Sequence, residues 1–119
     1  ILEYEPLGRA QLTLVEAEAM REFSYAMGHV RRMQWEAALA RLDRADSLQQ
    51  RHGATNFAGR VAGLRSEALA HSGQHEAAGR EARRGIALGR ANSHAHYALA
   101  VMAFEQGRMP EAAAQAETC

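Results

Sequence analysis

A short motif recurs along this chain at a nearly fixed interval. Residues 73–78 read GQHEAA and residues 107–112 read GRMPEA, a shift of 34 positions, while a looser copy, MQWEAA, occupies residues 33–38. Alanine-rich segments with apolar residues at helical spacing flank each copy. Repeat periods in this range are typical of stacked helical hairpins. The recurrence therefore predicts an all-α array of antiparallel helix pairs, without strands.

The composition agrees with a helical array and limits the partners. The 119 residues suffice for one domain, and 47% of them are hydrophobic but only 6% aromatic. Alanine is the commonest residue, and it combines the highest helix propensity with a side chain small enough for close helix approach. All 14 basic residues are arginines, which suggests a bacterial gene rich in GC, and 14 acids balance them. A net charge of zero argues against nucleic acid as the partner.

The sequence also predicts a cytoplasmic location. The single cysteine, Cys119, allows no internal disulfide, so a reducing compartment is expected. No apolar run approaches the roughly 20 residues that a membrane-spanning helix needs, and no signal peptide is recognisable. Ile1 and Cys119 both look like cut points within a longer protein.

Helical spacing and turn residues divide the chain into a lead-in and three units. The lead-in covers residues 1–8, and the units cover about 9–52, 53–91 and 92–119. Turns are expected at Met33-Gln34, Gly73-Gln74 and Gly107-Arg108, because glycine readily adopts the left-handed conformation that ends a helix. The predicted helices span about 8–32, 35–51, 56–71, 75–89 and 93–106, with Pro110 in the first turn of a last helix.

Details of these units lead to two further expectations. Polar residues before two helices predict N-caps at Thr55 or Asn56 and at Asn92 or Ser93. The step from Met33 to Gly73 is six residues longer than the next step, and we attribute the excess to longer helices near residues 47–51.

The spacing of small residues and turns resembles the tetratricopeptide-repeat family. The family's turn glycine is matched by Gly73 and Gly107 and replaced by Met33. Its small residues at helix crossings are matched by Ala26, Ser66 and Ala100 in the first helices, and by Ala38, Ala78 and Ala112 in the return helices. The family's terminal proline is absent, since Arg90 stands near its place. The resemblance implies a right-handed superhelical stack of about three hairpins forming one domain, residues 1–119.

The resemblance implies a protein–protein interaction module with a scaffold or regulatory role in a bacterial protein. In that family the first helices line a concave groove that holds a peptide or a helix. The groove positions used as candidate binding residues are Met20, Phe23, Met27, Arg60, Glu67, His71, Tyr97, Val101 and Phe104. Gly63, His94 and Glu105 occupy further groove positions. A clamp for a C-terminal carboxylate is disfavoured, because Phe23 and Met27 occupy its places and the chain has no lysine.

Several alternatives stay open at this point. The long first step also resembles 40-residue variants in the sensor arms of large bacterial transcription regulators, which implies a ligand-sensing arm as the second function. Val101 and Phe104 could instead pack on a following helix outside this sequence, and a second copy of the chain could cover the groove as a homo-oligomer.

Metal, cofactor and catalytic sites are not expected. His71 with His75, and His94 with His96, invite a metal hypothesis, but no cysteine or clustered carboxylate completes either set. No nucleophile or phosphate-binding motif is recognisable, so no enzymatic activity is predicted. Three arginines follow i, i+3, i+4 spacing and are expected to form an exposed convex stripe: Arg80, Arg83 and Arg84.

Overall fold

The computed structural model describes residues 8–54, 56–88, 93–105, 107 and 114–116, and this part of the chain contains helices and no strand. The elements are α1 (Arg9–Arg31), α2 (Trp35–His52), α3 (Ala58–His71), α4 (His75–Leu88) and α5 (Ser93–Glu105). Residues 114–116 are also helical. The predicted all-α class is confirmed. None of these helices is both long and apolar enough to cross a membrane.

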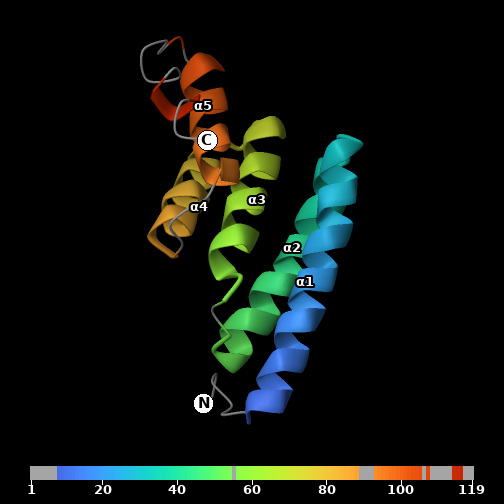
Figure 1. Ribbon diagram of the computed structural model, residues 1–119. Coiled ribbons are helices and arrows are strands. Elements are labelled where there is room, and N and C mark those ends of the chain that lie inside the picture. Colours follow the sequence, from blue (N-terminus) through green and yellow to red (C-terminus); the bar gives the residue numbers. More distant parts are fainter. Residues whose placement is uncertain (1–7, 55, 89–92, 106, 108–113, 117–119) are drawn as a thin grey trace.

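The helices are arranged as two hairpins followed by α5. The pairs α1–α2 and α3–α4 each pack closely, α3 lies against α2, and α5 packs on both α3 and α4 (Figure 1). The molecule is elongated, with extents of 48 × 26 × 26 Å. The second hairpin therefore covers a face of the first through α2 and α3, and α5 covers a face of the second.

The first three helices end with the same hydrogen-bonded turn. In each, a backbone N–H beyond the helix donates at 2.9 Å to a carbonyl five residues earlier: Gln34 to His29, Ala54 to Gln49 and Gln74 to Leu69. The residue before each donor has a positive φ, 58° at Met33, 68° at Gly53 and 86° at Gly73. This is the glycine-type helix terminator, and the turns predicted at Met33 and Gly73 are confirmed. Gly107 also has a positive φ, 78°, while Arg108 lies outside the described residues.

The helix lengths and caps follow the sequence only in part. Helix α2 has 18 residues and α4 has 14, so longer helices do account for the longer first step. The N-cap prediction at Asn56 was wrong, because α3 begins at Ala58 after Phe57, which makes no side-chain cap bond. Ser93 is the first residue of α5 and not a flanking cap. The other predicted caps, Thr55 and Asn92, the lead-in 1–7, Arg90, Pro110 and Ala112 lie outside the described residues.

Alanine supplies most of the buried core. Among the described residues eleven alanines are fully buried: Ala19, Ala26, Ala38, Ala45, Ala62, Ala68, Ala78, Ala82, Ala95, Ala98 and Ala103. The largest fully buried apolar side chains, Leu42, Leu64 and Val61, fill the space between α1, α2 and α3. The buried hydroxyl of Ser66 donates to the carbonyl of Gly63 at 2.6 Å. Crossings predicted at Ala26, Ser66, Ala38 and Ala78 are therefore confirmed as buried positions.

The crossing predicted at Ala100 was wrong. Ala100 is only half-buried, whereas Ala98 is fully buried and packs with Leu69 and Ala78. Because residues 98 and 100 point about 200° apart on a helix, the contact of α5 with α3 and α4 turns Ala100 away. The prediction placed the contact on the wrong side of α5.

Met33 offers a direct test of the shared helix terminator. A residue with a Cβ in the left-handed region costs about 1–2 kcal/mol, and the side chain of Met33 is 72% exposed, so little packing is lost with it. We predict that Met33→Gly raises the free energy of unfolding by about 1 kcal/mol in urea titrations. The matched control is Gly73→Ala, where an added Cβ meets no atom within 4 Å. That variant should lose about 1 kcal/mol through φ alone. No gain for Met33→Gly would contradict the turn assignment.

Ala98 tests the alanine crossings. A leucine at this fully buried position must push α5 away from α3 and α4, and overpacking of this kind costs about 1–3 kcal/mol. The same change at half-buried Ala100 should cost less. Urea denaturation of both variants checks the order, and a larger loss for Ala100→Leu than for Ala98→Leu would mean that the register of α5 is wrong.

Candidate functional site

Three aromatic rings meet at one end of the array. The imidazole of His71, in the last turn of α3, stacks on the indole of Trp35 with ring centroids 4.7 Å apart and planes 13° apart. On α5, the ring of Tyr97 lies 5.7 Å from the same imidazole, tilted by 42°. Trp35 is the first residue of α2, so this stack joins both hairpins and α5.

A second contact links the first helices of the units. The rings of Phe23, from α1, and His94, from α5, form a T-shaped pair with centroids 6.4 Å apart and planes at 69°. The Nδ1 atom of His94 lies 2.8 Å from Oε1 of Glu67, on α3. Helices α1, α3 and α5 therefore contribute side chains to one continuous surface, called here the α1–α3–α5 face.

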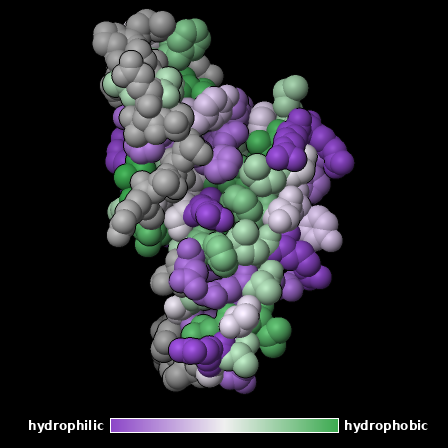
Figure 2. All heavy atoms as spheres, in the orientation of Figure 1, coloured by the Kyte–Doolittle hydropathy of each residue, from purple (hydrophilic) through white to green (hydrophobic). Residues whose placement is uncertain are grey.

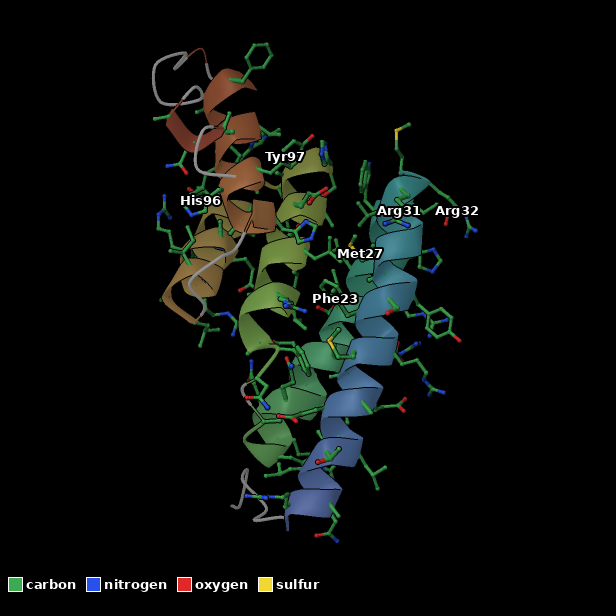
Figure 3. All side chains as sticks on the ribbon, viewed as in Figure 1. Phe23, Met27, Arg31, Arg32, His96 and Tyr97 are labelled. Carbon is green, nitrogen blue, oxygen red and sulfur yellow. The ribbon has the colours of Figure 1, made fainter. Side chains whose placement is uncertain are left out.

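The predicted site residues on α1 take part in the structure of this face. Phe23 and Met27 are half-buried and pack against the core residues of α2 and α3. Figure 3 shows both side chains between α1 and α3. Met20 is also half-buried. These residues form the floor of the face rather than freely projecting anchors.

The predicted site residues on α5 are more accessible. Tyr97 is 42% exposed and Phe104 61% exposed, while Val101 is half-buried. No described helix covers Tyr97 or Phe104, and a band of apolar atoms flanked by hydrophilic ones is visible in Figure 2. Tyr97 is therefore both held by His71 and open on its other side.

The structure brings together part of the predicted set. Phe23 and Glu67 both contact His94, and His71 contacts Tyr97. Arg60 stands apart, with its guanidinium 5.7 Å from the ring of Phe57. Sequence reasoning missed Trp35 as a site residue. The sequence feature that could have identified Trp35 is its position as an aromatic residue directly after the Met33-Gln34 turn. His71 likewise lies beside a turn, as the last residue of α3.

The histidine pairs considered for metal binding have other neighbours in the structure: His71 stacks on Trp35, and His94 lies beside Glu67. His96, labelled in Figure 3, has its Nδ1 atom 2.8 Å from Oε1 of Gln115. Within the described residues, no group of three or more histidine, cysteine or acidic side chains is placed to hold a metal ion.

The predicted arginine stripe of α4 is only partly correct. Arg80 and Arg83 are exposed, but Arg84 is half-buried, and its guanidinium bonds to Glu81 at 2.9 Å and to Asp46 of α2 at 3.0 Å. Arg65 of α3 completes the cluster, reaching Asp43 at 2.8 Å and Glu81 at 3.2 Å. This α2–α3–α4 ion cluster joins the two hairpins. Arg84 is therefore part of the contact between them and is not a free charge on the surface.

The ion cluster shifts the acid–base equilibria of its members. Burial alone would raise the pKa of Glu81, but hydrogen bonds and charge from Arg84 and Arg65 outweigh it and lower the pKa below its usual 4.5. The hydrogen bond to Glu81 chiefly raises the pKa of Arg84, against the opposing effect of burial. Glu81 is thus held as a carboxylate at neutral pH.

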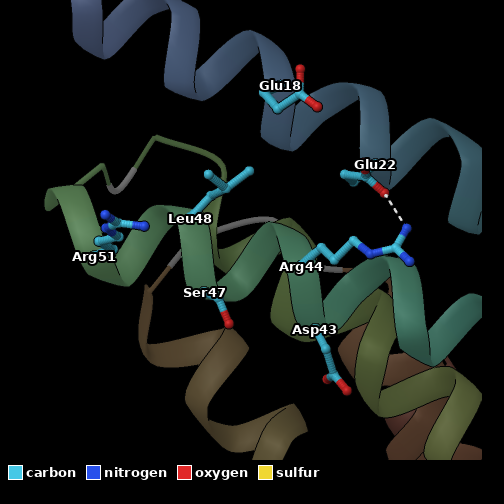
Figure 4. Close-up of a pocket in the computed structure, with 7 residues that line it drawn as sticks. All are labelled: Glu18, Glu22, Asp43, Arg44, Ser47, Leu48 and Arg51. Carbon is cyan, nitrogen blue, oxygen red and sulfur yellow. Dashed lines mark ion pairs between the residues drawn. The ribbon is translucent and has the colours of Figure 1, made fainter.

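A cleft of about 460 Å³ lies elsewhere, between α1 and α2 (Figure 4). Its lining is Glu18, Glu22, Asp43, Arg44, Ser47, Leu48 and Arg51. The side chain of Glu22 is only 8% exposed and pairs with Arg41 at 3.2 Å and with Arg44 at 3.8 Å. None of the nine predicted binding residues lines this cleft.

Comparison with other proteins does not assign the site. The chain matches no protein-family model, no curated protein and no solved structure. The functional assignment therefore depends on the side chains of the α1–α3–α5 face and of the cleft between α1 and α2.

The lowered pKa of Glu81 predicts how acid affects stability. A carboxyl whose pKa falls on folding stabilises the native state above its unfolded pKa and loses that effect as pH falls through the folded pKa. At pH 7 we expect Glu81→Gln to cost about 1–3 kcal/mol, since it removes charged hydrogen bonds. The gap to the wild type should narrow as pH falls from about 5 towards 3. Urea titrations of both proteins at each pH measure this difference in the free energy of unfolding.

The control for this experiment is Glu76→Gln, an exposed acid in the first turn of the same helix. Its effect on stability at pH 7 should stay within about 0.5 kcal/mol. A gap between wild type and Glu81→Gln that is constant or wider at pH 3 would contradict the ion cluster.

Proposed function

We propose that this chain is a protein-interaction module of the tetratricopeptide-repeat type, and that a helix or an extended peptide binds on its α1–α3–α5 face. The observation that carries the proposal is Tyr97, an aromatic residue fixed on one side by His71 and 42% exposed. Aromatic residues of this kind supply large contact area with little loss of conformational entropy. A scaffold or regulatory role in a bacterial protein is the biological setting that we infer.

The repeat character supports this proposal. The first helix of each hairpin, α1 and α3, ends in the same hydrogen-bonded turn, with Met33 and Gly73 at equivalent positions. The buried small residues Ala26 and Ser66 occupy equivalent places in α1 and α3. In such arrays the first helices lie side by side and present a continuous surface to partners.

Exposure of large apolar side chains supports a binding role for the face. Phe104 is 61% exposed at the end of α5, and Met20 and Val101 are partly accessible. Contiguous apolar surface on a protein normally marks an interaction site. Because the floor of the face is packed against the core, a partner would meet an already ordered surface.

The cleft between α1 and α2 favours a second candidate, a ligand-sensing arm of a larger transcription regulator. Its volume suits a small molecule. However, Glu18 pairs with Arg21, Glu22 with Arg41 and Arg44, and Asp43 with Arg65, so a ligand would have to compete with existing ion pairs. We therefore place binding of a protein partner first. We expect no catalytic activity.

A partner isolated with the full chain tests the proposal. With its affinity measured by calorimetry, we predict that Tyr97→Ala weakens binding tenfold or more, in the range of interface hot spots of about 1.4 kcal/mol or above. Arg83→Ala, at an exposed position of α4, is the control and should stay within twofold. Loss of binding for Arg83→Ala with an unchanged affinity for Tyr97→Ala would place the site on the other side of the array.

A further inference from the structure

Three polar residues are buried in the described part of the chain: Glu22, Gln49 and Ser66. Glu22 pairs with Arg41 at 3.2 Å. The hydroxyl of Ser66 donates to the carbonyl of Gly63 at 2.6 Å. The side chain of Gln49, on α2, differs from both, because neither its Oε1 nor its Nε2 atom has a hydrogen-bond partner among the described residues. Gln49 is only 2% exposed, so its amide has lost its hydrogen bonds to water and gained none in return.

Gln49 lies on the buried face of α2, near the end of that helix. It follows Leu42 by seven residues and Ala45 by four, which places it within about 40° of each around the helix axis. Leu42 and Ala45 are fully buried core residues. The amide therefore occupies a position of α2 that belongs to the core.

The first turn of α3 lies level with this amide. Helices α2 and α3 run in opposite directions (Figure 1), and Arg65 contacts Asp43 at 2.8 Å. Six residues further along α2 and six residues back along α3, both about 9 Å from this contact, are Gln49 and Gly59. The unpaired amide is thus placed where α2 ends and α3 begins.

Little apolar packing holds this α2–α3 junction, defined as residues 49–54 and 56–60. Its buried residues other than Gln49 are small: Ala54, Ala58 and Gly59. Phe57, directly before α3, is half-buried and makes no side-chain cap bond. Larger fully buried side chains resume at Val61. Regions with few buried apolar contacts are the ones that open most readily.

We propose that the α2–α3 junction is an opening point built into the array. In its closed form the amide of Gln49 is excluded from water and unpaired, and in its open form the same amide is bonded to water. The core around Leu42 and Leu64 stays packed in both forms, because it lies beyond the junction. The ion pairs of Arg65 and Arg84 with α2 also lie beyond it and stay formed. The polar side chain lowers the free energy of opening, since the missing hydrogen bonds penalise the closed form alone. This inference is independent of the proposed function.

Native-state hydrogen exchange of the full chain, followed by NMR, tests the proposal. Two reporter amides have their acceptors in the junction: the N–H of Ala54 donates to the carbonyl of Gln49 at 2.9 Å, and the N–H of Val61 donates to that of Phe57 at 3.0 Å. Their exchange rates should be insensitive to urea well below the unfolding midpoint, as for a local opening that exposes little surface. The amide of Leu42, in the core, should exchange through global unfolding and accelerate with urea.

Replacing the amide by an apolar group isolates its contribution. Gln49→Met keeps an unbranched side chain and removes both polar atoms, so it should slow exchange at Ala54 and Val61 about tenfold. The matched control is Gln50→Met, which changes an exposed glutamine at the next position and should leave both rates within twofold. The amide of Gln74, in the equivalent turn after α3, should exchange at the same rate in all three proteins.

Three results would overturn the inference. Faster exchange or a lower urea midpoint for Gln49→Met would mean that the amide is satisfied in the closed form, as by an internal water molecule. Rates at Ala54 and Val61 that change less than twofold would mean that Gln49 does not control the opening. Rates that rise with urea in parallel with that of Leu42 would mean that the junction opens only when the whole chain unfolds.

Discussion

Close approach of the helices at alanine positions is the constraint on which this structure depends. Where Ala38, Ala68 and Ala78 are fully buried, neighbouring backbones can pack closely with few large side chains between them. Each alanine removes little apolar area from water, so the core needs many such contacts and the few larger residues Leu42, Leu64 and Val61. A core of this kind tolerates little added volume, because protein interiors are close-packed. The stacking of successive hairpins follows from it.

Two sets of polar and aromatic contacts fix how the hairpins sit on this core. On one side, Arg65 and Arg84 connect α2, α3 and α4 through the ion cluster. On another side, the ring of His71 contacts both Trp35 and Tyr97, so aromatic packing connects α3 with α2 and α5. The charged groups of the ion cluster are paired with one another, whereas Tyr97 on the α1–α3–α5 face remains exposed to solvent. This difference explains why we assign binding to the α1–α3–α5 face.

Much of the fold could be predicted from the sequence, because the signals were local. Helical spacing and positive-φ positions such as Met33 and Gly73 are set by a few neighbouring residues, and the predicted helices and turns agree with the structure within the described residues. Apart from the N-cap expected at Asn56, what failed depends on tertiary contact. The side of α5 that touches α3, decided between Ala98 and Ala100, and the pairing of Arg84 with Asp46, 38 residues away, are not encoded in local spacing. For the site, spacing located Phe23 and Tyr97 but could not show that the ring of His94 contacts Phe23, or that His71, stacked on Trp35, contacts Tyr97.

Nuclear Overhauser contacts between aromatic rings test most directly whether the first helices share one face. The chain has one tryptophan, three tyrosines, three phenylalanines and six histidines, so selective labelling can resolve these rings. The structure predicts contacts from the His71 ring to both Trp35 and Tyr97, and from Phe23 to His94. If His71 contacts Trp35 but Tyr97 and His94 contact neither α1 nor α3, then α5 does not lie beside the other two helices, and the α1–α3–α5 face does not exist in solution.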